Sequence, residues 1–219
     1  MTAAIEEALE QRLRFAAVRD RLAGSPLVRG GGVLVCRLTN PSTLASLQAD
    51  AVQAHQDAVE VRVVEPDQSD SRGDPDRWLE SAPGGPAQDA FACSATLAGV
   101  LQRATGVSWE LAGPGSWSYY RWPGHHLGIH RDLAICDVAV ITCVLNEGGH
   151  HQSGALRLWP TRAGEQLDEL RRDARGAIDL HVKTGDTVLL LGGVVPHRVL
   201  PLTTGHVRIV APLCYRIVG

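Results

Sequence analysis

The stretch that decides the fold is YYRWPGHHLGIHRD, residues 119–132. An aromatic pair and a Pro-Gly turn signal lead into alternating residues that end in His130 and Asp132. In an extended chain, side chains two positions apart point to the same face, so His130 and Asp132 would converge while Ile129 and Arg131 face away. An imidazole and a carboxylate on one face make half of a metal site.

A distant histidine would supply the other half. His197 lies in the segment PHRVL, residues 196–200, just after a strand-like run, and Arg208 follows it by eleven residues. Two histidines and one carboxylate on one face of an iron leave three positions open, which is typical of non-haem Fe(II) oxygenases. Each motif taken alone is usually a surface feature, but the ordered set favours a metal centre.

Composition limits the classes of protein to which the chain can belong. Its 219 residues are 44% hydrophobic and 21% charged, so neither a disordered nor a membrane protein is indicated. The formal net charge of −3 argues against a nucleic-acid binder. The length favours one domain, residues 1–219. No apolar run reaches the ~18 residues of a membrane span, and we expect no signal peptide.

The cysteines indicate a reducing compartment. Cys36, Cys93, Cys136, Cys143 and Cys214 are odd in number and lack CxxC spacing, so we expect free thiols and a cytoplasmic protein. We expect Cys136 and Cys143 to be ordinary buried thiols, because thiolates favour softer metals than the His and Asp set does.

Residues 1–106 are expected to form a support of helices and short strands. Helical spacing covers residues 3–23, 40–58 and 93–104, and strand-like runs cover 33–38 and 59–64. The segment 65–88 between them is rich in Asp, Ser, Gly and Pro, with Trp78 and Leu79 as its only large apolar residues. Such a long loop is usually disordered or a lid over a site, and both interpretations stay open.

Residues 107–219 are expected to form the catalytic core. Short strand-like segments occupy 108–112, 116–122, 127–132, 137–146, 154–159, 178–182, 186–191, 197–202 and 206–217, and a charged insert at 165–172 predicts one helix. Many short strands after a helical half predict an α+β class with a mostly β core. The expected architecture is a jelly roll or cupin-type barrel with buttressing N-terminal helices.

The order of motifs resembles the Fe(II)- and 2-oxoglutarate-dependent oxygenases, within them the prolyl-4-hydroxylase-like branch. The matching segments are YRWPG at 120–124, HRD at 130–132, TCVLN at 142–146, GALRLWP at 154–160, GDTVLL at 185–190 and PHRVLP at 196–201, followed by Gly205 and Arg208. The resemblance covers about residues 115–217. It implies a double-stranded β-helix.

The resemblance also implies a metal and its co-substrates. His130, Asp132 and His197 would hold Fe(II), 2-oxoglutarate would take two of the open positions, and O2 the last. The family's reaction is hydroxylation of an unactivated C–H bond with release of succinate and CO2.

Three further residues would bind 2-oxoglutarate. A guanidinium can meet its distal carboxylate with paired, charge-assisted hydrogen bonds, and Arg208 is the candidate. By the resemblance, Tyr120 would add a hydroxyl contact and Thr142 would line the same pocket. His206 shares the strand parity of Arg208, so which of the two meets the carboxylate stays open, as does ligation of the metal by His126.

The resemblance implies a hydroxylase, and the lack of a recognition module favours a small-molecule substrate: an amino acid, a peptide or a natural-product intermediate. We expect no nucleic-acid or membrane partner. One alternative is a protein or peptidyl-residue hydroxylase. Another is a cupin-like protein that binds a metal or ligand without catalysis.

Overall fold

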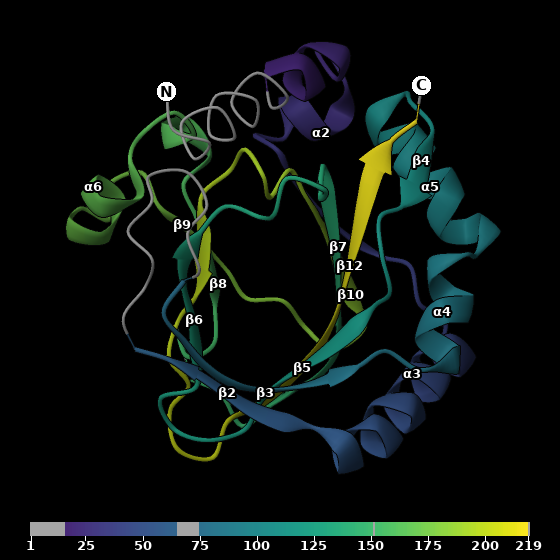
Figure 1. Cartoon of the computed structure of the whole chain (residues 1–219), viewed down its shortest axis with the longest axis vertical. Helices are drawn as coiled ribbons and strands as arrows, with labels where there is room; N and C mark the ends of the chain where they lie inside the picture. Colours follow the sequence, from purple (N-terminus) through teal and green to yellow (C-terminus); the bar gives the residue numbers. More distant parts are fainter. Residues whose placement is uncertain (1–15, 65–74, 151, 219) are drawn as a thin grey trace, which may run out of the picture.

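The computed structural model describes residues 16–64, 75–150 and 152–218. Twelve strands in these ranges form one curled antiparallel sheet (Figure 1). The strands are β1 (Val33–Arg37), β2 (Val59–Val63), β3 (Arg77–Pro83), β4 (Trp109–Leu111), β5 (Ser116–Tyr120), β6 (His126–His130), β7 (Val138–Glu147), β8 (Leu156–Leu158), β9 (Ile178–Leu180), β10 (Asp186–Leu190), β11 (His197–Val199) and β12 (Val207–Ile217).

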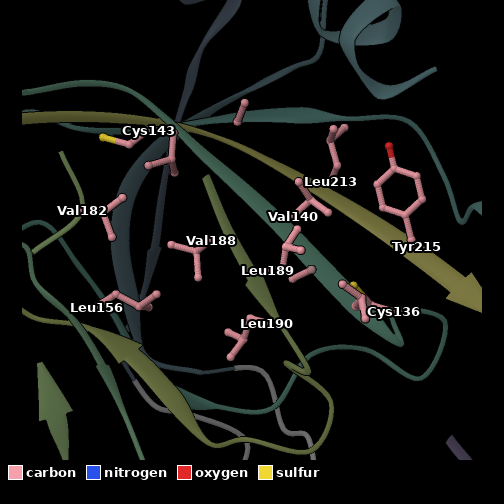
Figure 2. Close-up of a cluster of buried hydrophobic side chains, with 14 of the residues drawn as sticks. Cys136, Val140, Cys143, Leu156, Val182, Val188, Leu189, Leu190, Leu213 and Tyr215 are labelled. Atoms are coloured by element: carbon pink, nitrogen blue, oxygen red, sulfur yellow. The ribbon is translucent and has the colours of Figure 1, made fainter. Parts of the chain in front are cut away.

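The sheet folds back on itself to make two facing layers. Its strand order is β1-β10-β7-β12-β5-β3-β6-β11-β8-β9, with β2 beside β3 and β4 beside β12. Figure 1 shows β7, β10 and β12 facing β6, β8 and β9 across the interior. Side chains from both layers share one core, and Figure 2 shows Val188 of β10 near Leu156 of β8. This is the jelly-roll, or double-stranded β-helix, architecture that the sequence predicts.

The helices are α2 (Pro26–Arg29), α3 (Pro41–Ala54), α4 (Pro86–Ala92), α5 (Ala95–Thr105) and α6 (Leu167–Arg172), with 3-10 turns η1 (His55–Asp57) and η2 (Pro160–Arg162). The Asn40 side chain caps α3 by accepting a hydrogen bond from the Thr43 amide at 2.8 Å, and Pro41 follows at the first helical position. Helix α5 ends at Gly106, whose φ of 78° suits glycine.

The helices cover the outer faces of the two layers. The Tyr119 hydroxyl of β5 donates to the Ala51 carbonyl of α3, and the Tyr215 hydroxyl of β12 donates to the Ala92 carbonyl of α4, each at 2.7 Å. On the other layer, Ile129 of β6 packs with Leu167 and Leu170 of α6. The predicted buttress of helices is therefore present, and the interior between the layers is left to side chains of the strands.

The loop expected over residues 65–88 is wrong for its second half. Residues 77–83 form β3, which pairs with β2, β5 and β6, and residues 86–92 form α4. Trp78 is held on the sheet, because its Nε1 donates to Glu60 at 3.0 Å and Arg62 lies 5.0 Å from the ring centre. It is not a lid residue. Residues 65–74 lie outside the described ranges, as do residues 3–15 of the first expected helix, of which 16–21 are helical.

The expectation of free thiols is wrong for one pair. Cys136 and Cys214, which are 78 positions apart in the sequence, form a disulfide with Cα atoms 4.9 Å apart. The pairing of β7 with β12 places Ala139 opposite Cys214, which brings the residues just before β7 to this position. Cys143 is a buried free thiol, as expected.

No helix in the described ranges combines the length and the apolar character needed to cross a lipid bilayer.

Candidate metal centre

His130, Asp132 and His197 come together at the start of β11. The strand pairing sets His197 directly opposite His130, and the two ring centres lie 4.2 Å apart. Asp132 follows the end of β6, and its Oδ1 lies 3.6 Å from His130 Nε2 and 3.5 Å from His197 Nε2. One potential ligand atom from each of the three residues lies within 4.8 Å of the other two.

Backbone carbonyls orient both imidazoles. His130 Nδ1 lies 2.8 Å from the Gly128 carbonyl oxygen, and His197 Nδ1 lies 3.0 Å from the Val195 carbonyl oxygen. A carbonyl only accepts, so each Nδ1 carries the hydrogen. The two Nε2 atoms that face Asp132 then offer their lone pairs, which is the tautomer that binds a metal.

The electrostatics of the cluster favour a cation. Burial alone would raise the pKa of Asp132, but the neighbouring His197 and His130 hold it well below its usual range. Burial and the proximity of His197 lower the pKa of His130. Burial opposes a charge on His197 as well, yet Asp132 outweighs it and raises that pKa. Asp132 Oδ2 is buried and has no hydrogen-bond partner among the described residues, so a metal ion fits here.

Gly192 makes room for the carboxylate, a role that sequence reasoning missed. The Asp132 amide donates to the Gly192 carbonyl at 2.9 Å, which fixes the two loops together. A Cβ at position 192 would overlap Asp132 Oδ2 and lie 3.3 Å from His197 Cε1. The only signal in the sequence was a Gly-Gly pair directly after the 186–191 run.

Arg208 is buried on β12, with 2% of its surface exposed. It lies opposite Tyr120 of β5, and its guanidinium carbon is 5.2 Å from the Tyr120 ring centre. Burial raises the pKa of Tyr120, whereas the charge of Arg208 and a hydrogen bond from it act in the other direction. Among the described residues, Arg208 Nη1 has no hydrogen-bond partner. A buried guanidinium with an open N–H fits the carboxylate of a ligand.

The geometry distinguishes Arg208 from His206. His206 Nδ1 lies 2.6 Å from Ser153 Oγ, and its Nε2 lies 2.5 Å from Asn146 Oδ1. Both ring nitrogens are therefore engaged, and Arg208 keeps the open donor. Sequence reasoning gave no role to Ser153 and used Asn146 only as part of a motif.

Thr142 is buried on β7. The next residue on β7, Cys143, points to the opposite face of the strand. Burial raises the pKa of the Cys143 thiol, and the charge of Arg208 opposes that rise. The Thr142 hydroxyl lies 3.0 Å from that of Thr187. Thr142 shares a face with Val138, which pairs with Tyr215, whose hydroxyl reaches α4. Strand parity puts Thr142 and Cys143 on opposite faces of β7, and a contact of Thr142 with 2-oxoglutarate stays a prediction.

His126 does not join the metal cluster. Its Nδ1 lies 2.8 Å from the Gly124 carbonyl and its Nε2 lies 3.2 Å from Asp76. Within the described ranges, the group of possible metal ligands contains His130, Asp132 and His197 without it.

No family model and no curated protein matches this chain. Solved structures do. The non-heme alpha-ketoglutarate-dependent epimerase SnoN from nogalamycin biosynthesis has a TM-score of 0.67 and 13% identity, over 92% of this chain and 83% of that one. A Pseudomonas putida prolyl-4-hydroxylase has a TM-score of 0.56 and 19% identity, over 94% and 100%.

A prolyl hydroxylase from Trichoplax adhaerens, in complex with a peptide fragment of the hypoxia inducible factor, has a TM-score of 0.62 and 13% identity, over 98% of this chain and 93% of that one. These similarities extend over nearly the whole chain in each case. The chain therefore has the jelly-roll fold of the Fe(II)- and 2-oxoglutarate-dependent oxygenases, with structures of the prolyl-4-hydroxylase branch among its neighbours.

Proposed function

We propose that this protein is an Fe(II)- and 2-oxoglutarate-dependent oxygenase that hydroxylates an unactivated C–H bond of a small molecule. The observation that carries the proposal is the convergence of His130, Asp132 and His197 in a fold whose interior also holds the buried Arg208. SnoN has been crystallised with Fe3+, alpha-ketoglutarate and nogalamycin RO, which supports the same metal and co-substrate here and a substrate of the natural-product kind.

Each residue has a defined part in this proposal. His130 and His197 would bind Fe(II) through Nε2, and Asp132 through its carboxylate. Arg208 would pair with the distal carboxylate of 2-oxoglutarate, beside the Tyr120 hydroxyl. When bound, Fe(II) and 2-oxoglutarate supply the oxidation: 2-oxoglutarate becomes succinate and CO2, one oxygen atom of O2 going into succinate and the other into the substrate C–H bond. The protein would orient the metal, 2-oxoglutarate and the substrate, and the buried side chains around them would exclude water.

The test is succinate formation that depends on a substrate. The protein is supplied with Fe(II), 2-oxoglutarate and O2, and amino acids, peptides and natural-product intermediates are added one at a time. We expect one of them to stimulate succinate release and to gain the mass of one oxygen atom. If 2-oxoglutarate binds but no compound in any class raises succinate above the background, the protein is a metal and ligand binder of the cupin kind.

A protein or peptidyl-residue hydroxylase is the second candidate. It is favoured by the two prolyl hydroxylases among the structural neighbours, one of which is in complex with a peptide. The peptide arm of the same screen separates the two candidates. Hydroxylation of a residue within a peptide, with no turnover of free amino acids or other small molecules, would replace the first proposal with this one.

A further inference from the structure

The imidazole of His206 fills a slot between two glycines. Only 2% of His206 is exposed. A Cβ on Gly149 would lie 2.6 Å from His206 Cε1, and a Cβ on Gly154 would lie 2.9 Å from the same atom. Neither glycine could become alanine without displacing the ring. These two glycines therefore leave the space that the histidine occupies.

Hydrogen bonds fix which ring nitrogen carries the proton. Asn146 Nδ2 donates to the Val182 carbonyl at 2.6 Å, so Asn146 Oδ1 is the atom that faces His206. An amide oxygen only accepts, and His206 Nε2 must be the donor. On the other side, Ser153 Oγ accepts from the Thr203 amide at 2.9 Å and keeps its own hydrogen for His206 Nδ1. The chain of bonds thus holds a neutral imidazole.

This imidazole and the stem of Arg208 border the same glycine, Gly154. The same Cβ on Gly154 that would lie 2.9 Å from His206 Cε1 would lie 3.5 Å from Arg208 Cδ, so the ring and the arginine stem both line the space beside this glycine. Burial and the charge of Arg208 both lower the pKa of His206, in agreement with the neutral form. The Tyr120 ring lies near the guanidinium, 5.2 Å from its carbon.

We propose that His206 is the positioning residue of Arg208: held by Asn146 and Ser153, it fixes the arginine stem so that the open N–H of the guanidinium meets the distal carboxylate of the co-substrate. The proposal rests on the proposed function, because it assigns the anion that Arg208 binds. Neutrality matters as well, since an imidazolium at this point would repel Arg208 and compete for the same carboxylate.

The test compares two keto acids on the Fe(II)-loaded protein without O2. 2-Oxoglutarate carries the distal carboxylate and 2-oxopentanoate lacks it, and calorimetry gives the affinity for each. In His206→Ala we expect the affinity for 2-oxoglutarate to fall by on the order of 10-fold. This is the lower end of the loss commonly seen when a residue that supports a ligand-binding side chain is removed. The affinities for Fe(II) and 2-oxopentanoate should stay the same. His206→Gln, which can still donate to Asn146, should recover most of the loss.

Two reference variants make the result decisive. Arg208→Ala defines the full loss of the carboxylate contact, and His181→Ala removes an exposed histidine and should change nothing. An unchanged preference for 2-oxoglutarate in His206→Ala, or an equal loss for both keto acids, overturns the role of His206. If His206→Ala does not fold, a failure of His206→Gln to bind 2-oxoglutarate better than 2-oxopentanoate also overturns it. If the wild type itself does not prefer 2-oxoglutarate, the proposed function fails instead.

Discussion

His197 is the residue whose removal tests the metal centre most directly. It is the proposed ligand that β11 contributes, and it lies opposite His130. In His197→Ala, one imidazole and one Asp132 contact are lost, and we expect stoichiometric Fe(II) binding to disappear. The measurement is an anaerobic titration of the purified protein with Fe(II). His181→Ala, at an exposed position, should bind iron like the wild type. Wild-type affinity in His197→Ala would exclude the triad.

Gly192 offers a test that leaves all three ligands in place. Because a methyl group at this position would overlap Asp132 Oδ2, Gly192→Ala should displace the carboxylate and weaken Fe(II) binding by about 10- to 100-fold, as loss of ligand support commonly does. Gly164→Ala is the matched control, since a Cβ there meets no heavy atom of the described residues within 4 Å. Equal iron affinity in the two variants would show that Gly192 does not shape the site.

At the scale of residues, the sequence predicts those positions that depend on strand parity or on the order of motifs along the chain. His130 and Asp132 could be paired by strand parity, and Arg208 by its place after His197. The face of Thr142 could not be predicted, because it depends on which side of β7 the helices cover. Gly192, Asn146 and Ser153 act through contacts across the fold, which no local spacing reveals.

At the scale of elements, tyrosine hydroxyls tie the helices to the sheet. Tyr215→Phe removes the bond to the Ala92 carbonyl near the end of α4 and should lower the free energy of unfolding by about 1 kcal/mol. Urea unfolding followed by circular dichroism measures this change. Iron affinity should not change, since the hydroxyl faces α4 rather than the interior. An unaltered unfolding midpoint would mean that water replaces the bond at no cost.

The strands of the C-terminal half could be predicted because turn residues separate them. Every segment expected between 107 and 217 is present, with ends that differ by three residues or fewer. Strand β3 was missed because its sequence, RWLESAP, has only Leu79 and Ala82 as buried apolar residues and follows a polar segment. Pairing with β2, β5 and β6 stabilises this strand. Such contacts with other segments cannot be predicted from the composition of the strand itself.

For the whole molecule, the disulfide joins the segment before β7 to the end of β12. Reduction, or the double change Cys136→Ser and Cys214→Ser, should lower the free energy of unfolding by about 2–4 kcal/mol, because the unfolded chain regains the freedom of a long loop. Urea unfolding with and without a reductant measures the effect. Cys93→Ser, at an exposed free thiol, is the control. A midpoint insensitive to reductant would show that the two sulfurs are not bonded in solution.

Strand β12 lies in the middle of the sheet and pairs with β7, β5 and β4, which precede it by long stretches of chain. Contacts between such distant segments form slowly during folding, because large loops must close before any pairing stabilises them. Until β12 docks, β5 and β7 present open edges on which a second chain could pair and aggregate. The same step brings Arg208 to Tyr120. In refolding experiments, two signals should therefore change with one rate constant. The first is the loss of the light scattering caused by transient aggregates, and the second is the recovery of 2-oxoglutarate binding.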